Sequence, residues 1–150
     1  MQAHHRLEMC RLAAGDESGV EVCGYEIERG GVSYTFETLR HLQGEYPGAE
    51  CCLLMGADMF LTIQNWREPD EIFRLATLCA CAREAGEYQA MLEHAPKLRE
   101  MGAKCEIIDA EPMPMSSTDI RRRIKEGADM SEYLNPAVWR YIREHKLYGT

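Results

Sequence analysis

The residues best suited to chemistry lie in segment 116–121, which reads SSTDIR. Its Ser-x-x-Asp spacing is that of a capping box, which predicts that a helix begins here. A helix start carries free backbone N–H groups and a partial positive charge, and Ser117, Thr118 and Arg121 would add hydroxyls and a full charge. This set suits phosphate binding. The same residues would also form an ordinary capped surface helix with its arginines in solvent, and spacing alone leaves both interpretations open.

A second group follows the apolar run 51–55 and consists of Gly56, Asp58 and Trp66. Glycine at the carboxyl end of a parallel strand lets a ligand approach the backbone closely. Asp58 could accept hydrogen bonds from a ribose, and Trp66 offers a face for a flat aromatic ring. The structural alternative is a strand terminator, a helix cap and a packed aromatic residue.

A third group is the segment 33–35, which opens a predicted helix with the residues SYT. Free N–H groups at that helix start, together with Thr35, could receive a carboxylate. Residues of these types also begin many helices that bind nothing. No Ser/His/Asp or Cys/His arrangement can be assembled from neighbouring segments of the sequence.

Hydrophobic periodicity predicts the elements that must position these residues. We expect one helix that ends near Gly15, helices over 35–46, 87–100 and 117–126, and helices that begin at Pro69 and at Pro136. Pro96 should kink or divide the helix over 87–100. We expect strands over 20–27, 51–55, 75–82 and 105–109. Strands that alternate with helices indicate an α/β fold with a largely parallel sheet, in which ligands bind beyond the carboxyl ends of the strands. The continuous apolar run 51–55 predicts a strand that is buried on both faces. We expect a single domain over residues 1–150.

The composition and net charge of the chain exclude several classes of function. The chain of 150 residues is 45% hydrophobic and 28% charged, as is typical of a globular protein, and its 17 basic against 25 acidic residues give a net charge of -8. This acidity argues against a nucleic acid partner. No apolar run reaches the roughly 20 residues of a membrane span, and the first residues lack the apolar core of a signal peptide. We therefore expect a cytoplasmic protein. Its seven cysteines are odd in number and include no C-x-x-C pair, so we expect reduced thiols that pack as small hydrophobic residues, with metal or redox chemistry as the alternative.

Taken in order, these segments resemble the nicotinate-nucleotide adenylyltransferases, bacterial enzymes of NAD biosynthesis. The matching pieces are HRLEM (5–9), SYTFETL (33–39), GADM (56–59) with Trp66 at the family spacing, SSTDIR (116–121), and YLNP (133–136) with the last helix. The resemblance implies a Rossmann-like parallel sheet of the nucleotidyltransferase type. It also implies transfer of the adenylyl group of ATP to nicotinate mononucleotide, with Mg²⁺ accompanying ATP and no permanently bound cofactor or metal.

The resemblance implies a role for each candidate residue. Those roles are ATP phosphate binding for Ser117, Thr118 and Arg121, adenosine binding for Gly56 and Asp58, contact with the pyridine carboxylate for Thr35, and stacking on the pyridine ring for Trp66.

One feature of the family is missing from the sequence. The family begins with a strand and a G-x-F-x-P-x-H-x-G-H loop whose histidines stabilise the reacting phosphates, and no such motif occurs here. We therefore expect a chain without the family's N-terminal βαβ unit, a sheet incomplete in its N-terminal half, and unknown catalytic residues. Two alternatives stay open: a non-catalytic nucleotide-binding module, and an incomplete fold that persists by association as a homo-oligomer.

Overall fold

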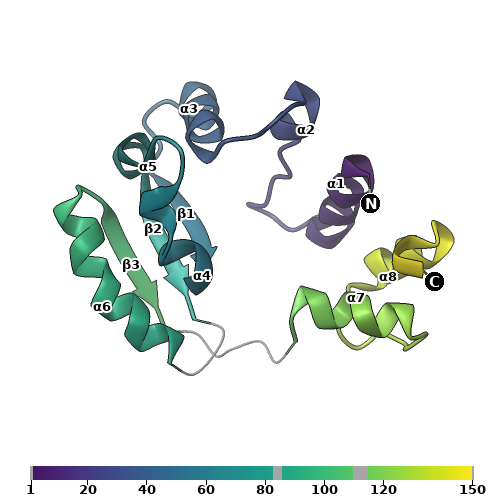
Figure 1. Cartoon of the computed structure of the whole chain (residues 1–150). Helices are drawn as coiled ribbons and strands as arrows, with labels where there is room; N and C mark the ends of the chain where they lie inside the picture. Colours follow the sequence, from purple (N-terminus) through teal and green to yellow (C-terminus); the bar gives the residue numbers. More distant parts are fainter. Residues whose placement is uncertain (1, 83–85, 110–114, 150) are drawn as a thin grey trace. The chain divides into compact units, whose positions relative to one another are not determined.

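A computed structural model describes residues 2–82, 86–109 and 115–149 of the chain. The chain forms two compact units, one made of Gly31–Met113 and the other of Met1–Gly30 together with Pro114–Thr150 (Figure 1). We call them the sheet unit and the helical unit. The expectation of a single domain over residues 1–150 stays a prediction.

The sheet unit contains three parallel strands in the order β1 (Cys51–Gly56), β2 (Ala76–Cys81) and β3 (Lys104–Ile108) (Figure 1). In the register of the first pair, Leu53 lies opposite Leu78. These strands confirm the three apolar runs predicted from the sequence, within a residue or two at their ends. The predicted α/β class with a parallel sheet is likewise confirmed.

Helices connect and cover these strands. They are α3 (Thr35–Glu45), α4 (Ala57–Phe60), the 3₁₀ turn η1 (Ile63–Asn65), α5 (Pro69–Leu75) and α6 (Glu87–Glu100). Their apolar side chains pack on one face of the sheet, where Phe60, Leu78 and Leu98 are fully buried. Of the two effects predicted for Pro96, a division of the helix is wrong, because α6 continues through it, and a kink stays a prediction.

The opposite face of the sheet has a different environment. Cys52 and Leu54 alternate with the core residues of β1 and are exposed, Leu54 to 71%. Within the described residues no strand pairs with the outer edge of β1. The expectation that this strand is buried on both faces is therefore wrong, because the helices of the sheet unit pack on the other face.

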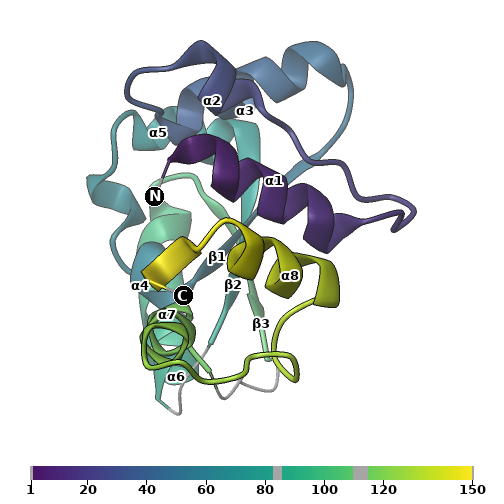
Figure 2. The same cartoon turned by 90° about the vertical axis from the view of Figure 1, so that its right-hand side faces the viewer.

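The helical unit is built from α1 (Ala3–Ala14), α2 (Tyr25–Arg29), α7 (Ser117–Lys125), α8 (Pro136–Glu144) and the 3₁₀ turn η2 (Leu147–Gly149). Its core is formed by Ile124, Met130, Val138, Ile142 and Leu147. Both views show α1 near α8, and a hydrogen bond between their side chains links the two helices (Figure 2). Among the described helices, none has both the length and the apolar character that a membrane crossing requires.

The predicted strand over 20–27 is wrong. The chain is irregular up to Gly24, and α2 begins at Tyr25. The backbone N–H groups of Ile27 and Glu28 both donate to the carbonyl of Gly24, at 3.0 and 3.1 Å. These local bonds replace the ladder that a strand needs, because the helical unit contains no described strand with which this segment could pair.

Candidate functional site

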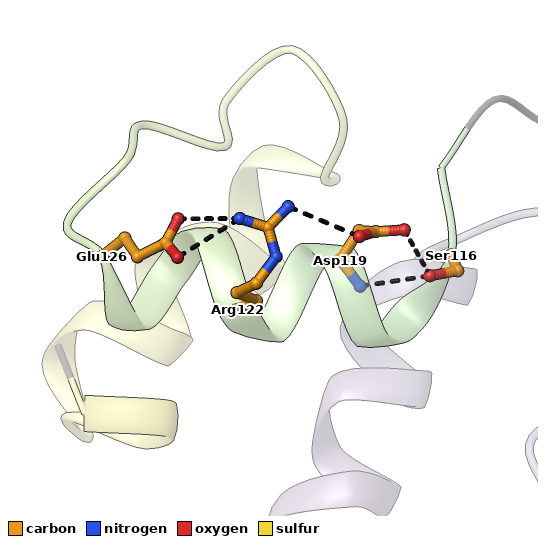
Figure 3. Close-up of polar contacts among 4 residues, drawn as sticks. All are labelled: Ser116, Asp119, Arg122 and Glu126. Atoms are coloured by element: carbon orange, nitrogen blue, oxygen red, sulfur yellow. Dashed lines mark hydrogen bonds and ion pairs between the residues drawn. The ribbon is translucent and has the colours of Figure 1, made fainter.

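The start of α7 is organised by Ser116. The backbone N–H of Asp119 donates to the Ser116 hydroxyl at 3.1 Å, and this hydroxyl donates to a carboxylate oxygen of Asp119 at 2.6 Å (Figure 3). The Ser116 hydroxyl is the main reason that the pKa of Asp119 is lowered, and Arg122 adds to the effect. The helix start predicted from the Ser-x-x-Asp spacing is confirmed.

Arg121 folds back along the first turn of α7. Its guanidinium donates to the carbonyl oxygen and to the hydroxyl of Ser117, each at 2.8 Å. Among the described residues no carboxylate pairs with Arg121, whereas the neighbouring Arg122 is held by Asp119 at 3.5 Å and Glu126 at 2.9 Å (Figure 3). Arg121 thus keeps its charge available at a helix start, as a phosphate site requires.

A cavity of about 550 Å³ adjoins this helix start inside the helical unit. Ser117 and Arg121 line it from α7, and Arg6 lines it from α1, beside a mostly apolar wall that includes Val138 and Ile142. This volume and this mixture of apolar wall and few polar groups are typical of small-molecule sites. Sequence reasoning missed Arg6, although it lies one turn before Met9 and Cys10 on the face of α1 that lines the cavity.

Gly56 and Asp58 lie where β1 passes into α4. Gly56 is buried at the end of the strand, and Asp58 is exposed in the first turn of the helix. No side chain caps α4, so the alternative interpretation of Asp58 as a helix cap is wrong. Both residues lie at the carboxyl end of a parallel strand, where α/β sheets bind their ligands.

The segments that carry Thr35 and Trp66 meet in the sheet unit through the residues next to them in the sequence, Tyr34 and Arg67. Arg67 lies over the ring of Tyr34, with its Cζ atom 4.5 Å from the ring centre. Tyr34 and Trp66 are both partly buried against the core of this unit. Tyr34 caps α3 without a side-chain hydrogen bond, and its carbonyl accepts from the N–H of Glu37 at 3.0 Å, so among the described residues the N–H groups of Thr35 and Phe36 remain available to a ligand. Sequence reasoning missed Arg67, whose contact with Tyr34 joins positions 33 residues apart.

The candidate residues thus fall into two groups. Ser117, Thr118 and Arg121 belong to the helical unit, and Gly56, Asp58, Thr35 and Trp66 belong to the sheet unit. Thr118 is exposed in the first turn of α7. The described residues contain no group of three or more His, Cys, Asp or Glu side chains that could hold a metal ion.

Known proteins match this chain along its length. The family model described as Cytidylyltransferase-like matches residues 1–123. A protein of Clostridium botulinum (strain Loch Maree / Type A3) named "Probable nicotinate-nucleotide adenylyltransferase" is 32% identical over 148 residues, which cover 97% of this chain and 74% of the relative. A protein of the same name from Gemmatimonas aurantiaca is 32% identical over 146 residues, covering 97% of this chain and 69% of the relative.

Solved structures match as well. Nicotinic acid mononucleotide adenylyltransferase of Plasmodium falciparum, solved with APC, superposes with a TM-score of 0.73 at 17% identity and covers 99% of this chain and 76% of its own. The structure of the same Plasmodium falciparum protein with NaAD superposes with a TM-score of 0.74 at 17% identity. This match covers 99% of this chain and 75% of that one. These matches establish the nucleotidyltransferase fold. Together with the sequence matches over nearly the whole chain, they lead to one conclusion: the protein belongs to the nicotinate-nucleotide adenylyltransferase family.

Proposed function

We propose that this protein transfers the adenylyl group of ATP to nicotinate mononucleotide, giving nicotinate adenine dinucleotide and pyrophosphate. The observation that carries this proposal is the match of 97% of the chain to relatives named for this activity. The geometry of α7 supports it, because a capped helix start and the guanidinium of Arg121 suit the phosphates of ATP.

In this reaction an oxygen of the mononucleotide's 5′-phosphate attacks the α-phosphorus of ATP. The bond from that phosphorus to the bridging oxygen breaks, and pyrophosphate leaves with the electron pair. Such a transfer needs no covalent nucleophile on the protein, because positioning and charge stabilisation supply most of the catalysis.

Each group of residues has a place in this scheme. Ser117, Thr118 and Arg121 would bind the phosphates of ATP, while Gly56 and Asp58 would contact its adenosine. Thr35 and Trp66 would hold the pyridine ring, Thr35 at the carboxylate and Trp66 against the ring face. The contact between Arg67 and Tyr34 supports the last pair, since it joins the segments that carry them.

Mg²⁺ would come to the protein with ATP. This cation is usually held by one or two carboxylates together with substrate phosphates and water. The described residues include no group of three or more His, Cys, Asp or Glu side chains that could hold a metal ion, so the phosphates of ATP would supply the main ligands. When bound, Mg²⁺ would neutralise phosphate charge.

We also propose a cytoplasmic location and no nucleic acid partner. All seven cysteines are free thiols, as expected in a reducing compartment. The net charge of -8 opposes non-specific binding to phosphate backbones.

A non-catalytic nucleotide-binding module is the second candidate function. The observation that supports it is the start of α7, where a capped helix end and the Arg121 guanidinium suit a phosphate group without any catalytic side chain. Such a module would use the α7 start to bind ATP without turning it over.

The two candidates are separated by measuring pyrophosphate release from the purified chain with ATP, Mg²⁺ and nicotinate mononucleotide. We expect release that depends on both nucleotides, and at a much lower rate than from a version extended by a family N-terminal unit with the histidine loop. Saturable ATP binding without any release would favour the binding module. Equal rates from the two proteins would contradict the importance given to the histidines.

A further inference from the structure

Two adjoining cavities lie beside Trp139 in the helical unit. The first measures about 600 Å³ and the second about 590 Å³, and their linings share Ser131, Trp139 and Arg143. We propose that the two cavities form a second ligand site, in which a nucleoside monophosphate stacks its base on Trp139 and places its phosphate between Lys125 and Arg143. This inference goes beyond the proposed function, since none of the residues assigned there to a substrate, all of them described, lines either cavity.

Trp139 is held in place by the loop between α7 and α8. The Asp129 carboxylate accepts from the backbone N–H of Ser131 at 3.0 Å, with the two-residue spacing of an Asx turn. Hydrogen bonds from Ser131 are the main reason that the pKa of Asp129 is lowered, and a hydrogen bond from the side chain of Trp139 lowers it further. The indole also packs against the core of the helical unit while it stays partly exposed. A restrained and partly exposed indole is a suitable stacking surface for a base.

Lys125 and Arg143 bring positive charge to the first cavity from two different helices. Lys125 is the last residue of α7, and Arg143 lies one turn after Trp139 on α8. Among the described residues no carboxylate forms an ion pair with Lys125 or Arg143, whereas Arg122, also on α7, binds Glu126 at 2.9 Å. An exposed ammonium and an exposed guanidinium without such a partner are well suited to a phosphate.

The acidic side chains of the two cavities determine how the ligand is oriented. Asp129 lines the first cavity, where its carboxylate already accepts hydrogen bonds from Ser131 and Trp139. Glu144 lines the second cavity, and within the described part of the chain no donor is bound to its carboxylate. An anion is therefore repelled more strongly in the second cavity. The phosphate belongs in the first cavity and the base in the second, with Trp139 bordering both.

This combination of groups selects the class of ligand. Volumes near 600 Å³ are typical of sites for small molecules. A free phosphate would use only the two cations, and a nucleoside would use only the indole. On a protein with a net charge of -8, an anion is retained only where local cations outweigh the overall repulsion. A molecule that carries both a base and a phosphate should therefore bind more tightly than either of its parts.

The test follows the binding of AMP by tryptophan fluorescence in the full chain carrying Trp66→Phe. The sequence has two tryptophans, so this variant leaves Trp139 as the reporter. We expect AMP to change its emission saturably, and adenosine and ribose 5-phosphate each to bind about tenfold more weakly. Arg143→Gln should weaken AMP binding about tenfold, because a hydrogen bond to a charged group is lost. Arg123→Gln removes an arginine of α7 outside both cavities and should leave the affinity unchanged.

A further variant separates this site from the start of α7. Arg121 lines the other cavity of the helical unit, so Arg121→Ala should leave the response of Trp139 to AMP unchanged. In that background, calorimetry should show that Trp139→Phe retains most of the AMP affinity and that Trp139→Leu loses it, since only phenylalanine keeps a ring for stacking.

Three results would overturn the inference while the proposed function stands. They are the absence of a saturable emission change with AMP, equal effects of Arg143→Gln and Arg123→Gln, and loss of the Trp139 response in Arg121→Ala. The proposed function is measured separately as pyrophosphate release, so its failure would leave the second site to be judged on AMP binding alone.

Discussion

At the scale of single residues, the arginines of this protein differ in whether an acidic side chain is within reach. Arg122 is tied to Asp119 and Glu126 along α7 and so contributes to the helix itself. Arg121, one position earlier, forms hydrogen bonds only with Ser117 among the described residues, so no acidic side chain neutralises its charge. Neighbouring side chains of the same type therefore have separable roles.

Arg121→Ala should weaken ATP binding about tenfold or more, because a hydrogen bond to a charged group is worth roughly 1.5–3 kcal/mol. Titration calorimetry with ATP and Mg²⁺ measures the effect. Arg122→Ala is the matched control: it removes the same charge one position along and should leave ATP affinity within about twofold. Equal weakening by the two variants would contradict a specific role for Arg121 and indicate a general effect of charge.

The Ser116 cap of α7 and the contact between Arg67 and Tyr34 show which side-chain contacts could be predicted from the sequence. The Ser116 cap was predictable because its partners lie within one turn, and the spacing alone specifies the geometry. The contact of Arg67 with Tyr34 was not, because it depends on how α3 and the segment before α5 pack in the folded sheet unit. Local chemistry is encoded in spacing, whereas contacts between distant segments require the tertiary structure.

At the scale of elements, α3 and α5 are joined by one carboxylate. Glu71 of α5 accepts from Arg40 of α3 at 2.7 Å and from Arg74 of its own helix at 2.8 Å. The hydrogen bonds from Arg74 and Arg40 are the main reason that the pKa of Glu71 falls to about 2. Its side chain is only 17% exposed, so this pair of bonds holds a contact between helices.

The bonds that Glu71 forms with Arg40 and Arg74 should make the free energy of unfolding depend on pH. The folded state keeps Glu71 ionised while the unfolded chain protonates it near pH 4.5, so its contribution is present above that pH and is lost as the pH falls toward 2. We expect the difference in the free energy of unfolding between the unchanged protein and Glu71→Gln to shrink between pH 5 and pH 3 in urea titrations. Glu100→Gln, which alters an exposed carboxylate of α6, is the control. A constant difference would refute the link.

The contact between α1 and α8 is sensitive to protons for a different reason. The Nδ1 atom of His5 lies 2.9 Å from the hydroxyl of Tyr141, and the His5 ring lies 4.1 Å from that of His4 and 5.3 Å from that of His145, between centres. Desolvation lowers the pKa of His5 below 6.5, and the neighbouring histidines lower it further. The folded state therefore disfavours the proton that the unfolded chain accepts.

Acid should accordingly weaken the helical unit as the pH falls below about 6.5, where the unfolded chain binds more protons than the folded one. His145→Gln removes one positive neighbour and should move the pKa of His5 back toward 6.5. An NMR titration of the His5 ring measures this shift. His41→Gln in the sheet unit provides the control, and an identical His5 titration in all three proteins would contradict the proposed coupling.

Hydrophobic periodicity predicted most elements because their burial patterns are local. It failed for 20–27, where Val20 and Val22 alternate with polar residues as in a strand. A strand also needs a neighbour, and the helical unit contains no described strand to pair with it. Val20 is 55% exposed, so the alternation did not correspond to a buried face.

At the scale of the whole molecule, the exposed side of β1 is the feature through which we expect copies of the chain to associate. β1 lies at the edge of the sheet, and Leu54 on it is 71% exposed (Figure 1). Edge strands with apolar side chains promote association. The sequence predicted this strand correctly, but its exposure could not be predicted, because an apolar run does not indicate which of its faces is covered.

We expect the protein to self-associate as its concentration rises, and Leu54→Lys to shift that association to higher concentration by placing a charge on the edge strand. Sedimentation velocity over a range of concentrations, under reducing conditions, measures this. Leu92→Lys on α6, where the leucine is 42% exposed, should behave like the unchanged protein. Association that is the same in all three proteins would exclude the open face as its cause.

The helical unit has a consequence for how the chain is made. It is assembled from two stretches separated by the whole sheet unit, and His5 bonds to a tyrosine 136 positions later. At about 5–20 residues per second, a ribosome needs roughly ten seconds to synthesise that interval. The continuous sheet unit can therefore fold during translation while α1 is still without α8. Helices α7 and α8 are synthesised last, so a chain released early from the ribosome would contain a folded sheet unit without the helix that carries Ser117 and Arg121.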